Sequence, residues 1–149
     1  MRKKLLCCAV MISFLCSCVS HTGNELDDYD ALLALPSQRY RAVYDQDTVF
    51  LRLIKKGSRV KGTLNFVYGN GLKEHGSFKG WMNGDTLLGN YHYQDQKGSW
   101  QRNPIAMLSN GKTLHLGVGQ REFAWGRAYF KKNEPIDYDK GRFIFMKND

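Results

Sequence analysis

Apolar and polar residues alternate along most of the chain from residue 39 onward. The clearest example is residues 59–68, where Val60, Leu64 and Phe66 share one face and the residues between them are polar. Alternation with a period of two is typical of an antiparallel strand that buries one face. The same pattern recurs along the chain and predicts about eight strands, at 39–45, 48–55, 59–68, 73–82, 85–94, 99–108, 112–120 and 141–147.

Short turn sequences separate these predicted strands. Asn70-Gly71, Asn83-Gly84 and Asn110-Gly111 each lie between two alternating segments. Asn and Gly readily adopt the positive φ angles that tight hairpins require, so consecutive strands are expected to pair as a meander. Residues 125–130 add a short ninth strand or extend the seventh, and residues 131–140 form a long loop.

An eight-stranded meander has two edges that must be protected, and closure into a barrel removes both. We therefore predict an all-β fold, a single antiparallel meander closed into a lipocalin-like barrel. A curved open sheet or a two-sheet sandwich is the alternative. A barrel of eight strands is either filled by side chains or holds one small ligand.

Aromatic residues occupy many alternating positions, and two interpretations of them stay open. The set comprises Phe66, Tyr68, Phe78, Tyr91, Tyr93, Trp100, Trp125 and Phe130. They either form the barrel core or line a cavity for a small apolar ligand. In the second case Tyr91, Tyr93 and Trp100 would line the cavity, and Arg102, on the same face as Trp100, would be its polar anchor.

The N-terminus has the features of an export signal. Arg2, Lys3 and Lys4 precede an apolar stretch at 5–15, which is too short to cross a bilayer of about 30 Å. It ends in Leu15-Cys16-Ser17-Cys18, which resembles a bacterial lipoprotein signal. The resemblance implies cleavage before Cys18 and attachment of lipid to that cysteine.

This interpretation divides the chain into three parts and changes the meaning of its cysteines and charge. We expect a signal peptide at 1–17, an acidic tether at 18–35 and one β domain at 36–149. The other cysteines, Cys7, Cys8 and Cys16, lie in the leader, so the mature domain is expected to contain no disulfide. The whole chain has a net charge of +8, whereas 36–149 holds nineteen Lys or Arg and ten Asp or Glu, a net charge of +9.

The expected location follows from the signal. Val19 follows Cys18 where an Asp would favour retention in the inner membrane, so we expect attachment to the outer membrane, on its periplasmic face or at the cell surface. The basic residues are scattered near turns rather than clustered, which argues against a nucleic-acid partner. The expected partners are the membrane, through the lipid, and an envelope protein, a polysaccharide or a small apolar ligand.

Five segments carry a resemblance to a known family: residues 40–53, 60–64, 76–80, 84–88 and 143–147. Together they resemble small lipoproteins from Bacteroidetes-type bacteria. The resemblance supports the fold and the location and carries no activity.

The sequence contains no recognisable catalytic apparatus. His21, His75, His92 and His115 do not stand at metal-ligand spacing, and no nucleophile motif or nucleotide-binding loop is present. We therefore expect no catalytic residue, metal or cofactor. The leading hypothesis is a non-enzymatic lipoprotein with a binding or structural role. The alternatives are a lipocalin-like carrier or sensor of a small hydrophobic ligand, and an envelope enzyme or enzyme inhibitor.

Overall fold

Ten strands make up the regular structure of the protein, which is a computed structural model that describes residues 35–148. No helix occurs among these residues, and in them no helical segment is long and apolar enough to cross a membrane. The predicted signal peptide, Cys18 and all of the predicted tether except Leu35 lie outside the described residues. The strands are β1 Gln38–Tyr44, β2 Asp47–Lys56, β3 Arg59–Val67, β4 Lys73–Asn83, β5 Thr86–Gln94, β6 Trp100–Ser109, β7 Thr113–Leu116, β8 Arg121–Ala124, β9 Arg127–Phe130 and β10 Ile144–Lys147.

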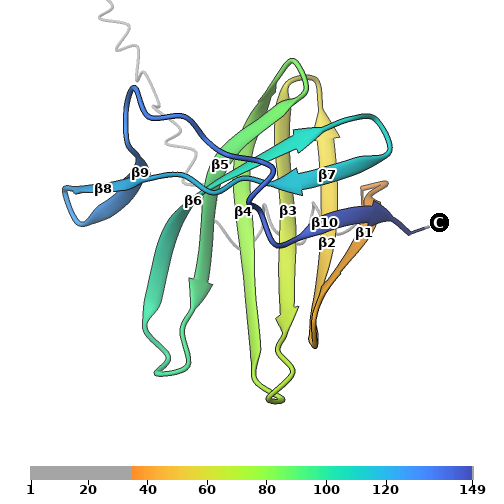
Figure 1. Ribbon diagram of the computed structural model, residues 1–149, viewed down its shortest axis with the longest axis horizontal. Coiled ribbons are helices and arrows are strands. Elements are labelled where there is room, and N and C mark those ends of the chain that lie inside the picture. Colours follow the sequence, from red (N-terminus) through yellow and green to blue (C-terminus); the bar gives the residue numbers. More distant parts are fainter. Residues whose placement is uncertain (1–34, 149) are drawn as a thin grey trace, which may run out of the picture.

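Eight of the strands close into an antiparallel barrel, as predicted. The order around the barrel is β1-β10-β7-β6-β5-β4-β3-β2, so β1 to β7 form the meander and β10 closes it (Figure 1). β10 pairs with β7 on one side and with β1 on the other, where only Tyr40 and Arg41 face it in register. The open-sheet and sandwich alternatives are therefore wrong.

The alternation in the sequence decides which side chains fill the barrel. The best-buried large side chains are Phe78, Phe145, Leu51, Leu64 and Leu87, each less than 2% exposed or at that limit. Polar neighbours on the same strands point outward, as in β3, where Lys61 and Thr63 flank a glycine and Leu64 is buried. At about 25 cal/mol per Å² of apolar area buried, a single core of this kind stabilises the domain without disulfides.

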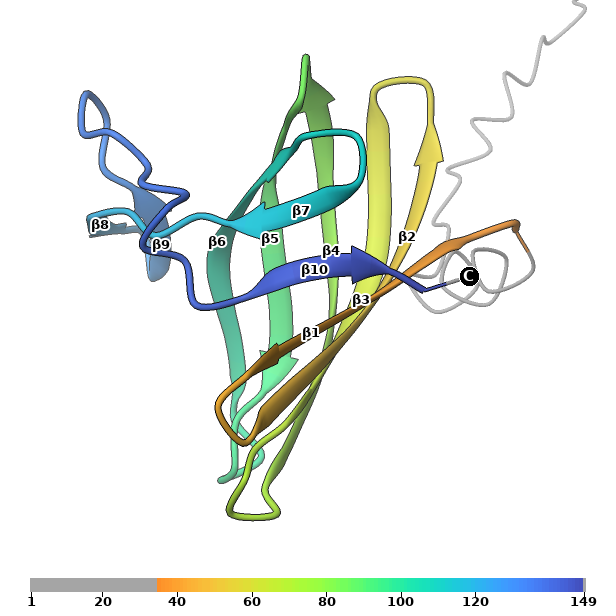
Figure 2. The same ribbon diagram turned by 45° about the vertical axis from the view of Figure 1, so that its right-hand side comes forward.

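The β8–β9 hairpin lies outside the barrel. It forms a separate two-stranded sheet that projects from one side (Figures 1 and 2). Its inner strand, β9, packs on the outside of β6, where Ala106 and Ala128 are both almost fully buried.

The seventh predicted strand is shorter than expected. The prediction ran from 112 to 120, but β7 ends at Leu116. The long loop packs back against Gly117, where an added Cβ would lie 2.5 Å from Ile136 and 2.8 Å from Tyr138. Val118 then pairs with Asp137 in an isolated bridge, and this pairing draws the chain away from β6.

The early end of β7 leaves part of β6 without a barrel neighbour. β6 pairs with β7 only through Met107–Ser109, although it pairs with β5 along Trp100–Leu108. Gly117 adds one backbone hydrogen bond to the carbonyl of Ala106. Beyond that point, one side of β6 borders a gap in the barrel wall.

Candidate functional site

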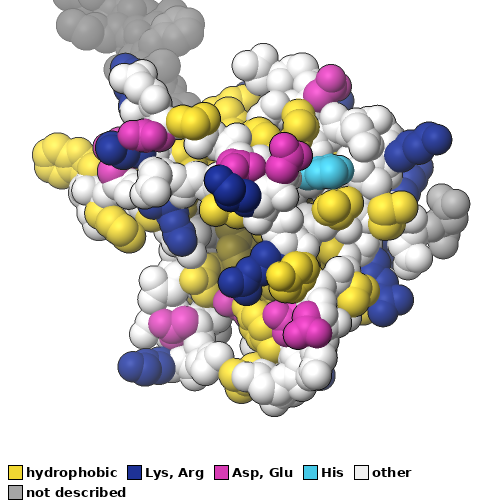
Figure 3. All heavy atoms as spheres, in the orientation of Figure 1, with side chains coloured by type: hydrophobic (Ala, Val, Ile, Leu, Met, Phe, Trp, Pro, Cys, Tyr) yellow, Lys and Arg dark blue, Asp and Glu magenta, His cyan; other side chains and the backbone are white. Residues whose placement is uncertain are grey.

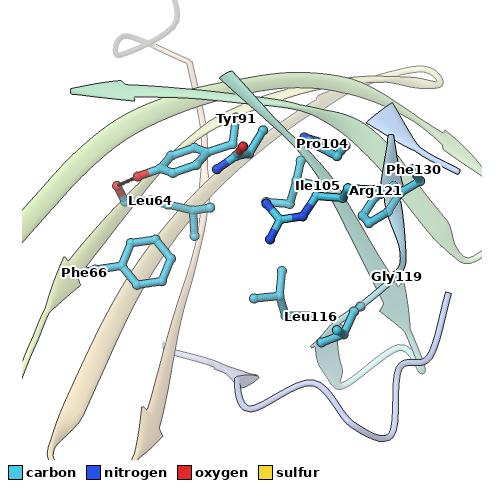
Figure 4. A pocket seen from close by; sticks show the side chains of 12 residues that line it. Leu64, Phe66, Tyr91, Pro104, Ile105, Leu116, Gly119, Arg121 and Phe130 are labelled. Carbon is cyan, nitrogen blue, oxygen red and sulfur yellow. Dashed lines mark hydrogen bonds between the residues drawn. The ribbon is translucent and has the colours of Figure 1, made fainter. Parts of the chain in front are cut away.

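A half-open pocket occupies this gap between β6 and the end of β7. Its volume is about 220 Å³. The wall combines inward-facing barrel residues with the chain that follows β7 and with β9 (Figure 4). The lining residues are Leu64, Phe66, Tyr91, Asn103, Pro104, Ile105, Leu116, Gly117, Val118, Gly119, Arg121 and Phe130.

Most of the wall is apolar or aromatic. Leu64 and Ile105 are buried in the core cluster, and Phe66 and Leu116 pack against that cluster. Phe130 comes from the outer hairpin and closes the far side, as Figure 4 shows. In the space-filling view, hydrophobic side chains lie at the floor of a recess near the centre of the face, with Lys or Arg side chains beside it (Figure 3).

Tyr91 forms the inner wall, and a glycine on the neighbouring strand gives it room. A Cβ on Gly76 would lie 2.6 Å from Cε2 of the Tyr91 ring, so the ring packs directly over the β4 backbone. Tyr93 stacks on Tyr91 with ring centroids 4.9 Å apart, and Phe66 lies 6.1 Å from the Tyr91 ring. The aromatic wall is therefore held by packing on both sides of Tyr91.

Glu74 is an inward-facing carboxyl group behind this wall. It shares the inward face of β4 with Gly76 and Phe78, and it accepts a hydrogen bond of 3.1 Å from the Tyr91 hydroxyl. Burial raises the pKa of Glu74, and hydrogen bonds from Tyr91 and Tyr68 oppose that rise. The balance favours the protonated carboxyl more than in water.

Glu74 also affects the pKa values of the neighbouring tyrosine hydroxyls. Burial first, and then the charge of Glu74, raises the pKa of Tyr68 to about 12. The same two causes raise the pKa of Tyr91. Both tyrosines are therefore neutral hydrogen-bond donors near neutral pH.

Arg121 is the cationic group of the pocket. It begins β8, and its side chain extends into the pocket in Figure 4. No carboxylate of the part of the chain that the structure describes forms an ion pair with it. Asn103 lies nearby on β6 and donates a hydrogen bond of 3.1 Å to the Tyr93 hydroxyl. Arg121 is an exposed residue, and its guanidinium group borders the apolar recess, where it is suited to bind an anionic group.

The structure brings together only part of the cavity lining that the sequence predicted. Tyr91 lines the pocket, and Tyr93 supports it from behind. Trp100 and Arg102 were placed on this face wrongly. Register pairs Tyr91 with Asn103 and His92 with Arg102, so Arg102 points outward. Trp100 is 64% exposed and stacks on His92 outside the barrel.

The error has a physical reason in the composition of β6. Residues 105–108 are all apolar, so the hydrophobic pattern does not show which face is inward. The face is set by pairing with β5, which makes the odd-numbered residues of β6 point inward.

The polar residues that matter, Glu74 and Arg121, were not among the predicted site residues. The sequence does indicate that Glu74 faces inward, because it lies an even number of residues from Phe78 on the same predicted strand. No feature of the sequence places Arg121 at the pocket, because its position depends on where the β8–β9 hairpin packs against the barrel.

No three His, Cys, Asp or Glu side chains within residues 35–148 gather as a possible metal site. The chain matches no protein-family model, no curated protein and no solved structure.

Proposed function

We propose that this chain is a lipid-anchored, non-enzymatic binding protein of the outer membrane that holds a small, mainly apolar molecule in the pocket beside β6. It would act as a lipocalin-like carrier or sensor. The observation that carries the proposal is the pocket itself, which has apolar and aromatic walls and one cationic lining residue, Arg121. This combination of apolar walls with a few fixed polar groups is the usual composition of a small-molecule site.

The volume limits the size of the ligand. A dry cavity of about 150 Å³ in another protein holds benzene, and sites for drug-sized ligands start at about 300 Å³. The pocket, at about 220 Å³, lies between them. The ligand is therefore a single-ring or short-chain molecule, or one end of a longer chain that leaves through the open side.

Charge indicates which end group the ligand carries. Arg121 lies in the pocket, whereas Glu74 lies behind the wall and is held by Tyr91. The accessible charge is thus positive, which favours a carboxylate or another anionic head group. Asn103 offers a second donor beside Arg121.

The location rests on the sequence. The basic n-region, the short apolar stretch and Cys18 support lipid attachment at the envelope. A carrier or sensor held at the outer membrane would meet small apolar molecules at the surface where they enter or leave.

Native mass spectrometry of the protein purified gently from membranes tests the proposal. We expect a mass excess that corresponds to one small molecule, released when the protein is denatured and found in the organic extract. A bare protein mass under the mildest conditions, together with an empty extract, would contradict a carrier role.

A further inference from the structure

The tip of the β8–β9 hairpin exposes two large aromatic side chains. Trp125 is 97% exposed and Phe123 is 81% exposed, more than any other large hydrophobic residue between 35 and 148. No aromatic ring of the described residues contacts either side chain. The hairpin projects from the barrel, so neither side chain contributes to the core (Figures 1 and 2).

The turn that carries Trp125 is unfavourable for this residue type. Trp125 and Gly126 are the central residues of the turn, with φ angles of 53° and 71°. Such a turn requires positive φ at both positions and favours Asn, Asp or Gly at the first. Among residues 35–148, the other non-glycine residues with positive φ are Asp45 and Asn133. Asp and Asn tolerate this conformation, whereas a bulky indole does not. The turn is therefore less stable with Trp at this position than with Asn, Asp or Gly, and it places the indole ring in solvent.

From these observations we propose that the Phe123–Trp125 tip inserts into the interfacial region of an anionic lipid bilayer. The proposal goes beyond ligand binding in the pocket. It rests on the proposed lipid anchor only in that the anchor keeps the barrel close to a membrane.

The chemistry of the hairpin fits a lipid surface. Trp has an apolar body and one N–H donor, and it concentrates at membrane–water interfaces for that reason. Arg127 follows the turn directly, where its cation can meet lipid phosphates, whereas Lys131 and Lys132 add positive charge at the base of the hairpin, where the Lys131 amide donates to the carbonyl of Gln120. Glu134 pairs with Lys131, while no carboxylate of the described residues pairs with Arg127 or Lys132.

Size argues against a protein partner as the occupant. Two aromatic side chains bury about 300–500 Å², at about 150–250 Å² each. A stable protein interface needs about 800 Å² from each partner. A bilayer needs no such area, because each side chain enters separately.

A lipid anchor alone would not orient the barrel, since sixteen residues lie between Cys18 and Leu35. A chain of that length spans at most about 60 Å, and its length alone sets no orientation of the barrel. A second contact through the hairpin would fix which side of the barrel faces the membrane. The pocket, whose wall includes Phe130 of the same hairpin, would then lie near the bilayer.

Three tryptophans allow a matched test in the full chain. Trp81 and Trp100 are also exposed, at 55% and 64%, but lie on barrel strands. Three single-tryptophan chains, each with the other two Trp changed to Phe, are reconstituted in vesicles of phosphatidylethanolamine and phosphatidylglycerol. Part of the lipid carries bromine on its acyl chains, which quenches only inserted indoles.

We expect Trp125 emission to shift to the blue and to lose most of its intensity in brominated vesicles. Trp81 and Trp100 should keep theirs. Flotation with the vesicles and palmitate labelling report the anchor independently. A chain that floats while Trp125 stays unquenched would overturn the insertion and leave the anchor intact; a chain that neither floats nor is quenched would overturn both. In vesicles without phosphatidylglycerol, the quenching of Trp125 should weaken.

Discussion

Glu74 is the most unusual side chain of the domain, because it places a carboxyl group against the aromatic interior of a barrel. Its half-buried position raises its pKa above the usual value, although the hydrogen bonds from Tyr91 and Tyr68 oppose that rise. The folded state therefore binds the Glu74 proton more tightly than the unfolded state does. The stabilisation from this proton is complete below the unfolded pKa, near 4.5, and is lost as pH rises through the folded pKa.

The first prediction concerns the pH dependence of stability. Glu74→Gln removes the titrating group and keeps an oxygen that can accept from Tyr91. We expect the variant to gain stability relative to the native chain as pH rises from 4.5 to 7, because only the native chain then buries a carboxylate. Urea denaturation of both proteins at several pH values measures this difference. A constant difference across that range would show that Glu74 titrates as it does in water.

In the proposed function, Arg121 selects ligands that carry an anionic head group. The second prediction compares Arg121→Gln with Arg127→Gln, a cation on the same hairpin that does not line the pocket. Hexanoate and hexanol serve as probes of equal chain length. We expect Arg121→Gln to weaken hexanoate binding about tenfold, since a hydrogen bond to a charged group contributes about 1.5–3 kcal/mol, and to leave hexanol binding unchanged. Equal losses for both probes, or an equal effect of Arg127→Gln, would contradict the anchoring role.

Among the strands, β10 is the one on which closure depends. It has only four residues, but its Phe145 is fully buried and its neighbours on the two sides, β1 and β7, are far apart in sequence. Without β10 the meander would have two open edges.

The third prediction follows from this position. Phe145→Ala should destabilise the domain by about 3–5 kcal/mol through lost burial and the cavity it leaves. Ile144→Ala, at the adjacent outward and 45% exposed position, should cost much less. Hydrogen exchange should show faster exchange of β1 amides in the first variant only. Similar losses of stability in the two variants would mean that β10 is peripheral.

The strands also show how far the sequence predicts this molecule. Period-two alternation and Asn-Gly turns located the meander from residues 59–68 onward, because these are local signals with local causes. The end of β7 depends on Ile136 and Tyr138 packing on Gly117, a contact between distant segments. The inward face of β6 depends on register, because both of its faces are apolar near Ile105. The pocket therefore depends on contacts between segments that are distant in the sequence. For the same reason, the position of Arg121 at the pocket could not be predicted from the sequence.

At the scale of the whole molecule, the barrel has a pocket in its wall, and the proposed lipid anchor lies outside the described residues. The fourth prediction tests the anchor. Cys18→Ser should abolish palmitate labelling and leave the protein unprocessed or free of the membrane, since the signal depends on that cysteine. Cys16→Ser, two residues earlier, is the matched control and should remain labelled. Unchanged labelling of Cys18→Ser would contradict lipid attachment.

The most direct test of the central proposal is an NMR titration of the protein with hexanoate, following the backbone amides. We expect saturable shifts at residues 103, 105, 116–119 and 121, which line the pocket, and none at the turns at the opposite end of the barrel. The Arg121→Gln protein should need about tenfold more hexanoate to reach the same shifts. Shifts that are absent, or that spread over the surface without saturating, would contradict a ligand site beside β6.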